Sequence, residues 1–261
     1  MKIVVTVKLV PDTNADKRID PASKRLVRSG VETVLNPFDE YALEAALQLK
    51  EKSPGSTVTV VSMAPETGKE IVRKALAMGA DDALMLSDPK AEGTDVWGTA
   101  YALAQAIKKA GFDLVICGTL STDSTTGELP GALAEYLGVA GVTYVRKLEV
   151  DGTTLRAERE TDNGYTKVSA ELPALVSVTK SANDPRYPAL KGIMGAKKKT
   201  ILIQSLAESG VDKPIGSDGA RTELTNISTP PARGKGEVFE AVDAVAGAQK
   251  ILDFLRERKL V

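Results

Sequence analysis

A ten-residue stretch, 118–127, contains the residue types and spacing that best suit binding chemistry in this chain. It reads Gly-Thr-Leu-Ser-Thr-Asp-Ser-Thr-Thr-Gly, so six hydroxyl side chains lie between two glycines. The stretch follows an apolar segment that ends at Cys117 and precedes a segment of helical character. Backbone amides and hydroxyls at the start of a helix form an anion site that suits one phosphate without a metal ion.

The stretch 118–127 is equally compatible with an ordinary loop, because Ser and Thr are common before helices. It is not a P-loop, since no Lys-Ser or Lys-Thr pair follows its glycines, and it is not a Gly-x-Gly-x-x-Gly dinucleotide turn. A pyrophosphatase loop of the Ser-Gly-Gly-x-Asp-Ser type is also absent after the first expected strand. Asp12 and Asp123 could orient a ribose or an adenine amino group, or simply cap turns. The pattern predicts that a nucleotide is held and not cleaved.

The chain contains no histidine and one cysteine, Cys117. These counts exclude histidine-based triads, histidine–metal sites, cysteine-pair redox motifs, structural zinc and an internal disulfide. Cys117 ends an apolar segment before a glycine, which favours a small buried hydrophobic side chain over a reactive thiol. We therefore expect no metal site and no self-contained catalysis, so the chain is predicted not to be an enzyme.

Acidic and basic residues nearly cancel, with 35 Asp and Glu against 34 Lys and Arg. Because aromatic residues are also sparse, neither nucleic acid nor an anionic membrane is expected as a partner. No apolar run approaches the length of a membrane span, and no signal peptide precedes the first expected strand, so direct membrane insertion is not expected. A cytoplasmic protein is predicted, with an organellar-matrix protein lacking its transit peptide as the alternative.

Strand-like and helix-like segments alternate in the first half of the chain, and these elements must position the loop at 118–127. Apolar strands are expected at residues 3–10, 57–63, 82–86 and 113–117. Helices are expected at residues 37–52 with Asn36 as N-cap, at 66–78, at 95–110 with Thr94 as cap, and from near 126 to Gly138. This order predicts an α/β fold with a mainly parallel open sheet sandwiched by helices.

The pattern changes after Gly138. Residues 142–150, 154–160 and 165–171 predict an antiparallel extension, and 172–178 predicts a central strand. An irregular arm is expected at 207–236, and a terminal helix at 237–258. We therefore expect a nucleotide-binding domain at 1–206, and an arm and helix at 207–261 that pack on a partner subunit.

The segment 183–199 combines loop-forming residues with apolar ones. Two prolines and two glycines argue against a regular helix or strand at its start. Its apolar side chains are Tyr187, Leu190, Ile193 and Met194, with Arg186 and several lysines around them. Composition alone favours a connector that folds back on its own core, and the alternative is an exposed docking element.

Several ordered motifs together carry a resemblance to a known family. They are Val-Lys-Leu-Val-Pro-Asp at 7–12, Leu-Asn-Pro-Phe-Asp-Glu-Tyr-Ala-Leu-Glu at 35–44, Ala-Leu-Ala-Met-Gly-Ala-Asp-Asp at 75–82, Glu-Arg-Glu at 158–160, and the whole segment 183–199. With these motifs the chain resembles the β subunit of the electron transfer flavoproteins over nearly its whole length. The last motif is the most specific of the set.

The resemblance implies a heterodimer in which an α subunit carries the redox-active FAD in a mobile domain. The β subunit is then expected to bind AMP, or a second FAD in electron-bifurcating members. Together with Asp123, the residues expected around this nucleotide are Val7, Lys8, Leu9, Asn36, Ser62, Met63, Ala64, Ser124, Thr125, Thr126 and Gly127. Flavin chemistry belongs to the cofactor, so a chain without histidine suits this role.

The resemblance also implies a partner-binding role for the segment 183–199, which matches the family's recognition loop. Its apolar anchor falls on Leu190, and the expected partner-binding residues are Arg186, Tyr187, Leu190, Ile193 and Met194. The implied partners are the α subunit, acyl-CoA-type dehydrogenases of fatty acid β-oxidation, and a quinone-linked oxidoreductase that accepts the electrons.

The sequence departs from the family pattern at two places. The loop at 118–127 is shorter than the usual version and lacks the Asp-Gly-Asp-Thr-Ala-Gln run of bifurcating members, which favours AMP over a second FAD. Thr166 stands where some members have an acidic residue. The alternatives are a bifurcating member with a second FAD, and a nucleotide-binding sensor similar to universal stress proteins.

Overall fold

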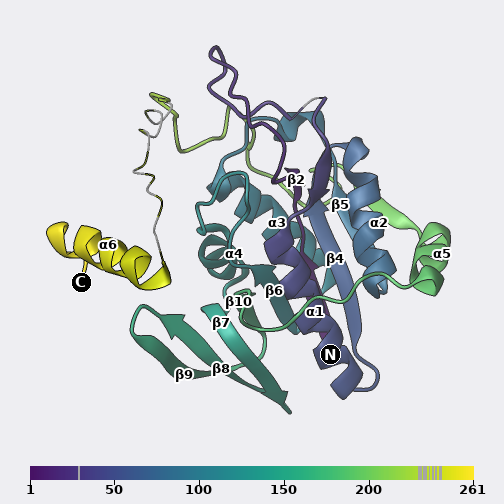
Figure 1. The fold of residues 1–261 in the computed structure, drawn as a ribbon. Coiled ribbons are helices and arrows are strands. Elements are labelled where there is room, and N and C mark those ends of the chain that lie inside the picture. The colour runs from purple at the N-terminus through teal and green to yellow at the C-terminus, as the bar shows by residue number, and fades with distance from the viewer. Residues whose placement is uncertain are drawn as a thin grey trace. The chain divides into compact units, whose positions relative to one another are not determined.

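The computed structural model describes residues 1–28, 30–228, 231, 234, 236, 238, 240 and 243–261. The chain divides into two compact units, Met1–Thr225 and Asn226–Val261. The first unit is an α/β domain built on one large sheet (Figure 1), so the expected fold class is confirmed.

The large sheet is parallel over most of its width. Its parallel strands are, in order across the sheet, β11 (Ile201–Gln204), β5 (Asp82–Leu86), β4 (Thr57–Met63), β1 (Lys2–Thr6), β6 (Leu114–Gly118), β10 (Ala174–Val178) and β7 (Ala140–Asp151). Two further strands, β8 (Thr154–Thr161) and β9 (Gly164–Glu171), continue the sheet beyond β7 in antiparallel pairing. The expected antiparallel extension is therefore present.

Helices cover both faces of the parallel strands, which explains why those strands are apolar throughout. Ile3 and Val5 of β1 pack with helices α1 (Pro37–Lys52) and α2 (Lys69–Met78) on one face. Val4 packs with helices α3 (Val96–Ala110) and α4 (Leu129–Leu137) on the other face. Alternate residues of one strand thus supply two separate cores.

Several expected boundaries agree with the structure, and others were wrong for identifiable reasons. β4, β5 and α1 have the expected bounds. The strand expected at 3–10 ends at Thr6, because the Lys8 backbone bonds the start of α1: its N–H donates to Asp39 at 2.7 Å and its carbonyl accepts from Asn36 N–H. The chain then forms β2 (Leu9–Pro11), which pairs with the unexpected strand β3 (Thr33–Leu35).

Helix starts account for most of the other errors. α3 is capped by Asp95, whose carboxylate accepts from Gly98 N–H at 2.8 Å, and not by Thr94. α4 begins at Leu129 and not near 126, because Thr125 and Gly127 adopt positive φ angles of 54° and 68°. Residues 66–78 divide into a 3₁₀ turn, Glu66–Gly68, followed by α2.

The first part of the expected arm belongs to the α/β domain. Ile215 of the arm is buried in the core on the α3 side, as is Leu206 just before the arm. Asp95 also accepts from the backbone N–H groups of Arg221 and Thr222, at 2.7 and 3.1 Å. Despite its irregular composition, this stretch therefore packs on and bonds to the α/β domain at least as far as Thr222.

The second unit contains helix α6 (Ala244–Glu257), which is capped by Asp243. This helix is shorter than the one expected at 237–258. Val238 and Glu240 are not helical, and residues 237, 239, 241 and 242 of that prediction lie outside the described residues. Packing of this unit on a partner stays a prediction.

Gly118, the last residue of β6, lets the start of α1 approach the sheet edge. A Cβ atom at this position would lie 2.5 Å from Asp39 Oδ1 and 2.7 Å from the Phe38 carbonyl carbon. Real side chains do not tolerate such distances to backbone. Glycine is therefore required here by close packing.

Replacing Gly118 with alanine should lower the free energy of unfolding by about 2 kcal/mol, since the new methyl group forces α1 away from β6. Gly131→Ala is the matched control, because no atom lies within 4 Å of a Cβ at that helical position. Alanine there should raise the free energy of unfolding by about 0.5–1 kcal/mol. Urea unfolding of both variants checks the pair, and equal effects would contradict the close-packing argument.

Candidate functional site

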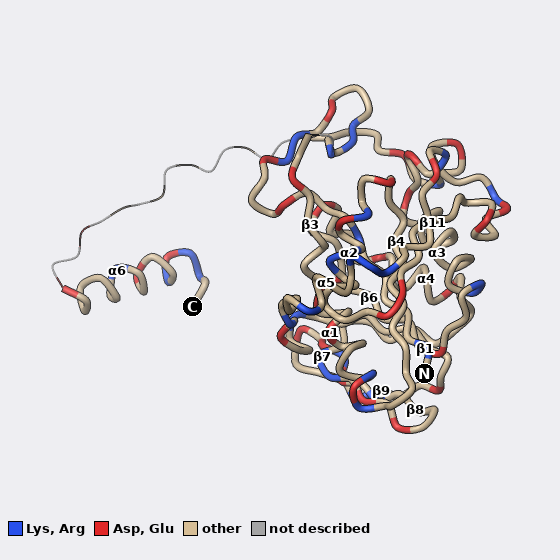
Figure 2. The backbone as a smooth tube through the Cα atoms, turned by 90° about the vertical axis from the view of Figure 1, so that its right-hand side faces the viewer, with Lys and Arg blue, Asp and Glu red and all other residues tan. Residues whose placement is uncertain are grey.

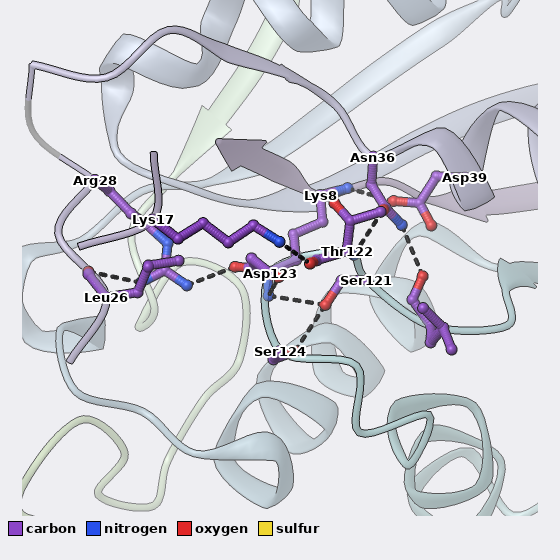
Figure 3. A network of polar contacts seen from close by, with 11 residues as sticks. Lys8, Lys17, Leu26, Arg28, Asn36, Asp39, Ser121, Thr122, Asp123 and Ser124 are labelled. Atoms are coloured by element: carbon purple, nitrogen blue, oxygen red, sulfur yellow. Dashed lines mark hydrogen bonds and ion pairs between the residues drawn. The ribbon is translucent and has the colours of Figure 1, made fainter. Parts of the chain in front are cut away.

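The polar network in Figure 3 lies where β1 and β6 end, at one edge of the parallel sheet. Ligands of open α/β sheets bind at this carboxyl edge. Of the expected nucleotide-binding residues, the network brings together Lys8, Asn36, Asp123 and Ser124. The loop at 118–127 forms its lower boundary in this view.

Asn36 holds the loop in place. Its side chain is buried, its Nδ2 donates to Leu120 O at 2.9 Å, and its Oδ1 accepts from Thr122 N–H at 3.2 Å. Asn36 is the residue before α1, as expected, but its side chain makes no capping hydrogen bond to that helix. An N-cap side chain usually accepts from an N–H of the first helical turn, but the Asp39 N–H already donates to the backbone carbonyl of Asn36. The side-chain amide of Asn36 positions the loop instead.

Asp123 is the centre of the charged contacts. Its side chain is fully buried and accepts from Lys8 Nζ at 2.7 Å and Arg28 Nη2 at 2.5 Å. Burial alone would raise the pKa of Asp123, but the charge and hydrogen bonds of Lys8, followed by the bond from Arg28, lower that pKa to about 2. Asp123 is therefore a fixed anion at neutral pH.

Asp39 lies in a different electrostatic environment, only a short distance along the same network. It is buried and accepts from the backbone N–H of Lys8 at 2.7 Å. Burial raises the pKa of Asp39 to about 7, although the neighbouring Asn36 side chain and the hydrogen bond from Lys8 N–H oppose this shift. The two carboxyl groups thus differ because Asp123 has two cationic side chains as partners.

The remaining expected contacts follow neighbouring strands. Val7 and Leu9 come after β1, and Ser62, Met63 and Ala64 end or follow β4, which pairs with β1. Ser124, Thr125 and Thr126 are exposed at the loop, before the positive-φ residue Gly127. The fold therefore gathers all three groups at the same sheet edge, and their contacts with a nucleotide stay a prediction.

One buried hydroxyl in the loop has no partner. Thr122 Oγ1 and Asn183 Oδ1 are the buried side-chain polar atoms without a hydrogen bond within the described part of the chain. Buried polar groups are nearly always satisfied, by protein, water or a ligand. The loop therefore fits a bound polar molecule. The described residues contain no cluster of His, Cys, Asp and Glu able to hold a metal ion.

Two residues of this network were missed by the sequence analysis. Lys17 Nζ donates to Thr122 O at 3.0 Å, and Arg28 contacts Asp123 as described above. Both come from residues 12–32, which connect β2 to β3 and lie about a hundred residues from the loop in sequence. No local pattern distinguishes these two cations from ordinary surface residues.

The segment 183–199 contains an unexpected helix, α5 (Leu190–Lys198), which packs on the domain while part of it stays exposed; its docking role stays a prediction. One side packs on α2: a Cβ at Gly192 would lie 2.3 Å from Ala77 O, and Ala196 is buried. The apolar side chains Tyr187, Leu190, Ile193 and Met194 stay exposed, with Tyr187 at 94% and Leu190 at 74%. Glycine within a helix is usually destabilising, and the close packing of Gly192 on α2 offsets this cost.

Arg186 points back onto α1. Its guanidinium donates to Glu44 at 2.7 and 3.0 Å and to Glu51 at 2.5 and 3.2 Å. The hydrogen bonds that Arg186 donates to Glu44 and then to Glu51 raise the pKa of Arg186 above its already high ordinary value. The structure thus gives Arg186 a role in fixing the chain that leads into α5, and its expected contact with a partner stays a prediction.

Comparisons with known proteins agree on one family. The family described as "Electron transfer flavoprotein domain" matches residues 24–209. The chain is 40% identical over 266 residues to "Electron transfer flavoprotein subunit beta" of Megasphaera elsdenii, covering 99% of this chain and 97% of that protein. The protein of the same name from Mycobacterium tuberculosis is 39% identical over 265 residues, covering 99% of both chains. "Caffeyl-CoA reductase-Etf complex subunit CarD" of Acetobacterium woodii is 36% identical over 263 residues, covering both chains fully.

Asp123→Asn should remove a pH-dependent part of the stability. The folded protein lowers the pKa of Asp123 from 3.8 to about 2, so its ion pairs stabilise the fold above pH 3.8 and cease to do so as the pH falls through 2. At pH 7 the variant should lose on the order of 1 kcal/mol, because solvent screens the half-exposed Lys8 and Arg28. Urea unfolding from pH 7 to pH 2 checks this. A difference between variant and wild type that does not shrink on acidification would contradict it.

Proposed function

Because the chain belongs to the electron transfer flavoprotein family as a β subunit, we propose that it is the non-enzymatic subunit of a heterodimeric electron carrier. The resemblance found in the sequence is confirmed by these relatives. In the proposed assembly this chain binds AMP, and an α subunit holds most or all of the FAD. The electrons pass from acyl-CoA-type dehydrogenases of fatty acid β-oxidation to a quinone-linked acceptor.

The observation that carries the proposed AMP site is the loop held by Asn36. Its hydroxyls at Ser124, Thr125 and Thr126 are exposed, while Thr122 Oγ1 is buried without a partner. Lys8 beside this loop supplies a cation for a phosphate. AMP would be held there by the loop amides and hydroxyls and would provide no redox chemistry. The flavin supplies the electron-transfer chemistry when bound.

A second candidate function has one specific observation in its favour. One relative is named as part of a caffeyl-CoA reductase–Etf complex, and the whole chain aligns with it. A bifurcating member would hold a second FAD in place of AMP. The loop at 118–127 lacks the expected run for such a member, which is why AMP is preferred. A stand-alone sensor is less favoured, since the family relationship covers nearly the whole chain.

The nucleotide content of the purified heterodimer tests this choice. After denaturation, one AMP and one FAD should be released per heterodimer, because this chain holds AMP and its partner holds the flavin. Separation by liquid chromatography with absorbance detection gives both amounts. Two FAD and no AMP would instead identify the bifurcating member, and the absence of flavin would contradict the carrier function.

The exposed side of α5 is the proposed docking surface for the dehydrogenase. A transient complex requires a small apolar anchor with charges around it, which Leu190 and the neighbouring lysines provide. The second unit, 226–261, is proposed to pack on the α subunit, since the described residues of α6 are mostly exposed. Figure 2 shows acidic and basic residues interspersed along the α/β domain, in keeping with a protein partner and not nucleic acid.

A cytoplasmic location is proposed. No helix among the described residues is both long and apolar enough to cross a membrane.

Leu190→Ala should raise the KM for the heterodimer in dehydrogenase-linked flavin reduction by about tenfold, because it removes an anchor side chain without touching the core. Flavin and AMP content should stay unchanged. Leu202→Ala is the matched control, since Leu202 is an exposed leucine of β11 elsewhere on the same domain. Stopped-flow or steady-state reduction at subsaturating carrier checks the pair. Equal kinetics for Leu190→Ala and wild type would contradict the docking proposal.

A further inference from the structure

We propose that Lys17 and Arg28 determine specificity at the nucleotide site by binding the phosphate group, so that the site accepts a nucleoside monophosphate and rejects the nucleoside. This inference rests on the proposed nucleotide-binding function. It assigns a ligand-recognition role to residues 12–32, which connect β2 to β3.

The described residues of the stretch 12–32, which are 12–28 and 30–32, form a hairpin-like excursion. Its base is closed by the bond from Asp12 N–H to Glu32 O at 2.9 Å. Further along, an isolated antiparallel bridge joins Ile19 to Leu26, and Val27 N–H donates to Arg18 O at 2.9 Å. Lys17 and Arg28 therefore extend from opposite sides of one paired segment toward the same loop (Figure 3).

The two side chains contact adjacent residues of the loop. Lys17 Nζ lies 3.0 Å from Thr122 O, and Arg28 Nη2 lies 2.5 Å from Asp123 Oδ2. Lys8 reaches the same carboxylate from the end of β1. Two cationic side chains thus contact Asp123, a third contacts the adjacent residue Thr122, and Asp39 accepts from the Lys8 backbone N–H. This arrangement leaves an excess of positive charge, which a phosphate dianion would balance.

The unpartnered hydroxyl of Thr122 is an independent sign of a ligand at this place. It belongs to the residue whose carbonyl accepts from Lys17 and whose N–H donates to Asn36. Since both backbone groups of Thr122 are satisfied, the missing bond concerns the side chain alone. A phosphate oxygen or the ribose of the same ligand would accept from this hydroxyl.

The selectivity follows from the charge on the ligand. AMP and adenosine share the base and the ribose, and only AMP offers a dianion to the cations. A hydrogen bond between charged groups contributes enough that loss of one cation should weaken AMP binding roughly tenfold to a hundredfold. Adenosine binding should not depend on Lys17 or Arg28.

The test uses the heterodimer freed of its nucleotide and titrated calorimetrically with AMP and with adenosine. Lys17→Gln and Arg28→Gln should each weaken AMP binding about tenfold or more and leave adenosine binding unchanged. Lys24→Gln is the matched control, because Lys24 lies on the same excursion but donates to Leu224 O and Thr225 O. It should change neither affinity.

A further variant separates a direct contact from an effect through Asp123. Removing Arg28 leaves the Asp123 carboxylate with fewer cations, and that carboxylate repels phosphate. If this were the whole effect, Asp123→Asn combined with Arg28→Gln would restore wild-type AMP affinity, and the inference would be wrong. With a direct contact, the combined variant should stay weak for AMP while Arg28→Lys recovers part of the loss.

The outcomes also separate this inference from the proposed function. Equal losses of AMP and adenosine binding in Lys17→Gln and Arg28→Gln would show that the excursion only shapes the pocket, which overturns the inference and leaves the AMP site standing. Unchanged AMP affinity in Lys17→Gln and in Arg28→Gln overturns it as well. If the wild-type heterodimer binds neither ligand, the proposed AMP site is wrong and the inference fails with it.

Discussion

The candidate nucleotide site depends on the side-chain amide of Asn36, which joins the start of α1 to the loop after β6. Its two hydrogen bonds, to Leu120 O and from Thr122 N–H, fix the loop while the backbone of Asn36 bonds Lys8. The adjacent approach of Asp39 and Phe38 to Gly118 brings the helix close enough for these bonds. Without this amide, the loop would have to satisfy two partly buried backbone groups elsewhere, and its hydroxyls would lose their fixed positions.

A comparable division of roles is seen in the segment 183–199. Gly192 and Ala196 pack α5 onto α2, and Arg186 binds Glu44 and Glu51 of α1. Burial of Glu44 would raise its pKa, but the bonds from Arg186 lower it, so the pair stays charged. The apolar residues can therefore remain exposed on a helix whose position is set by other contacts. Exposure of this kind is costly unless a partner covers it.

The sequence predicts the fold well where one local pattern decides the structure. β4, β5 and α1 have clear apolar periodicity and clear ends, and their bounds were correct. The strand at 3–10 and the start of α4 were wrong because tertiary bonds at Lys8 and positive φ angles at Thr125 and Gly127 override the local pattern. Lys17 and Arg28 could not be found at all, since only the fold brings them to a loop about a hundred residues away.

Within the described residues, each of the two proposed functional regions contains one buried side-chain oxygen without a hydrogen bond. Thr122 Oγ1 lies in the loop proposed to hold AMP, and Asn183 Oδ1 lies where the chain turns toward α5. The amide nitrogen of Asn183 is satisfied by Tyr41 O, so only its oxygen lacks a bond. In a core as apolar as this one, such defects should be rare and scattered. Each of the two atoms lies in a segment that carries a proposed contact, and water or a ligand would satisfy it.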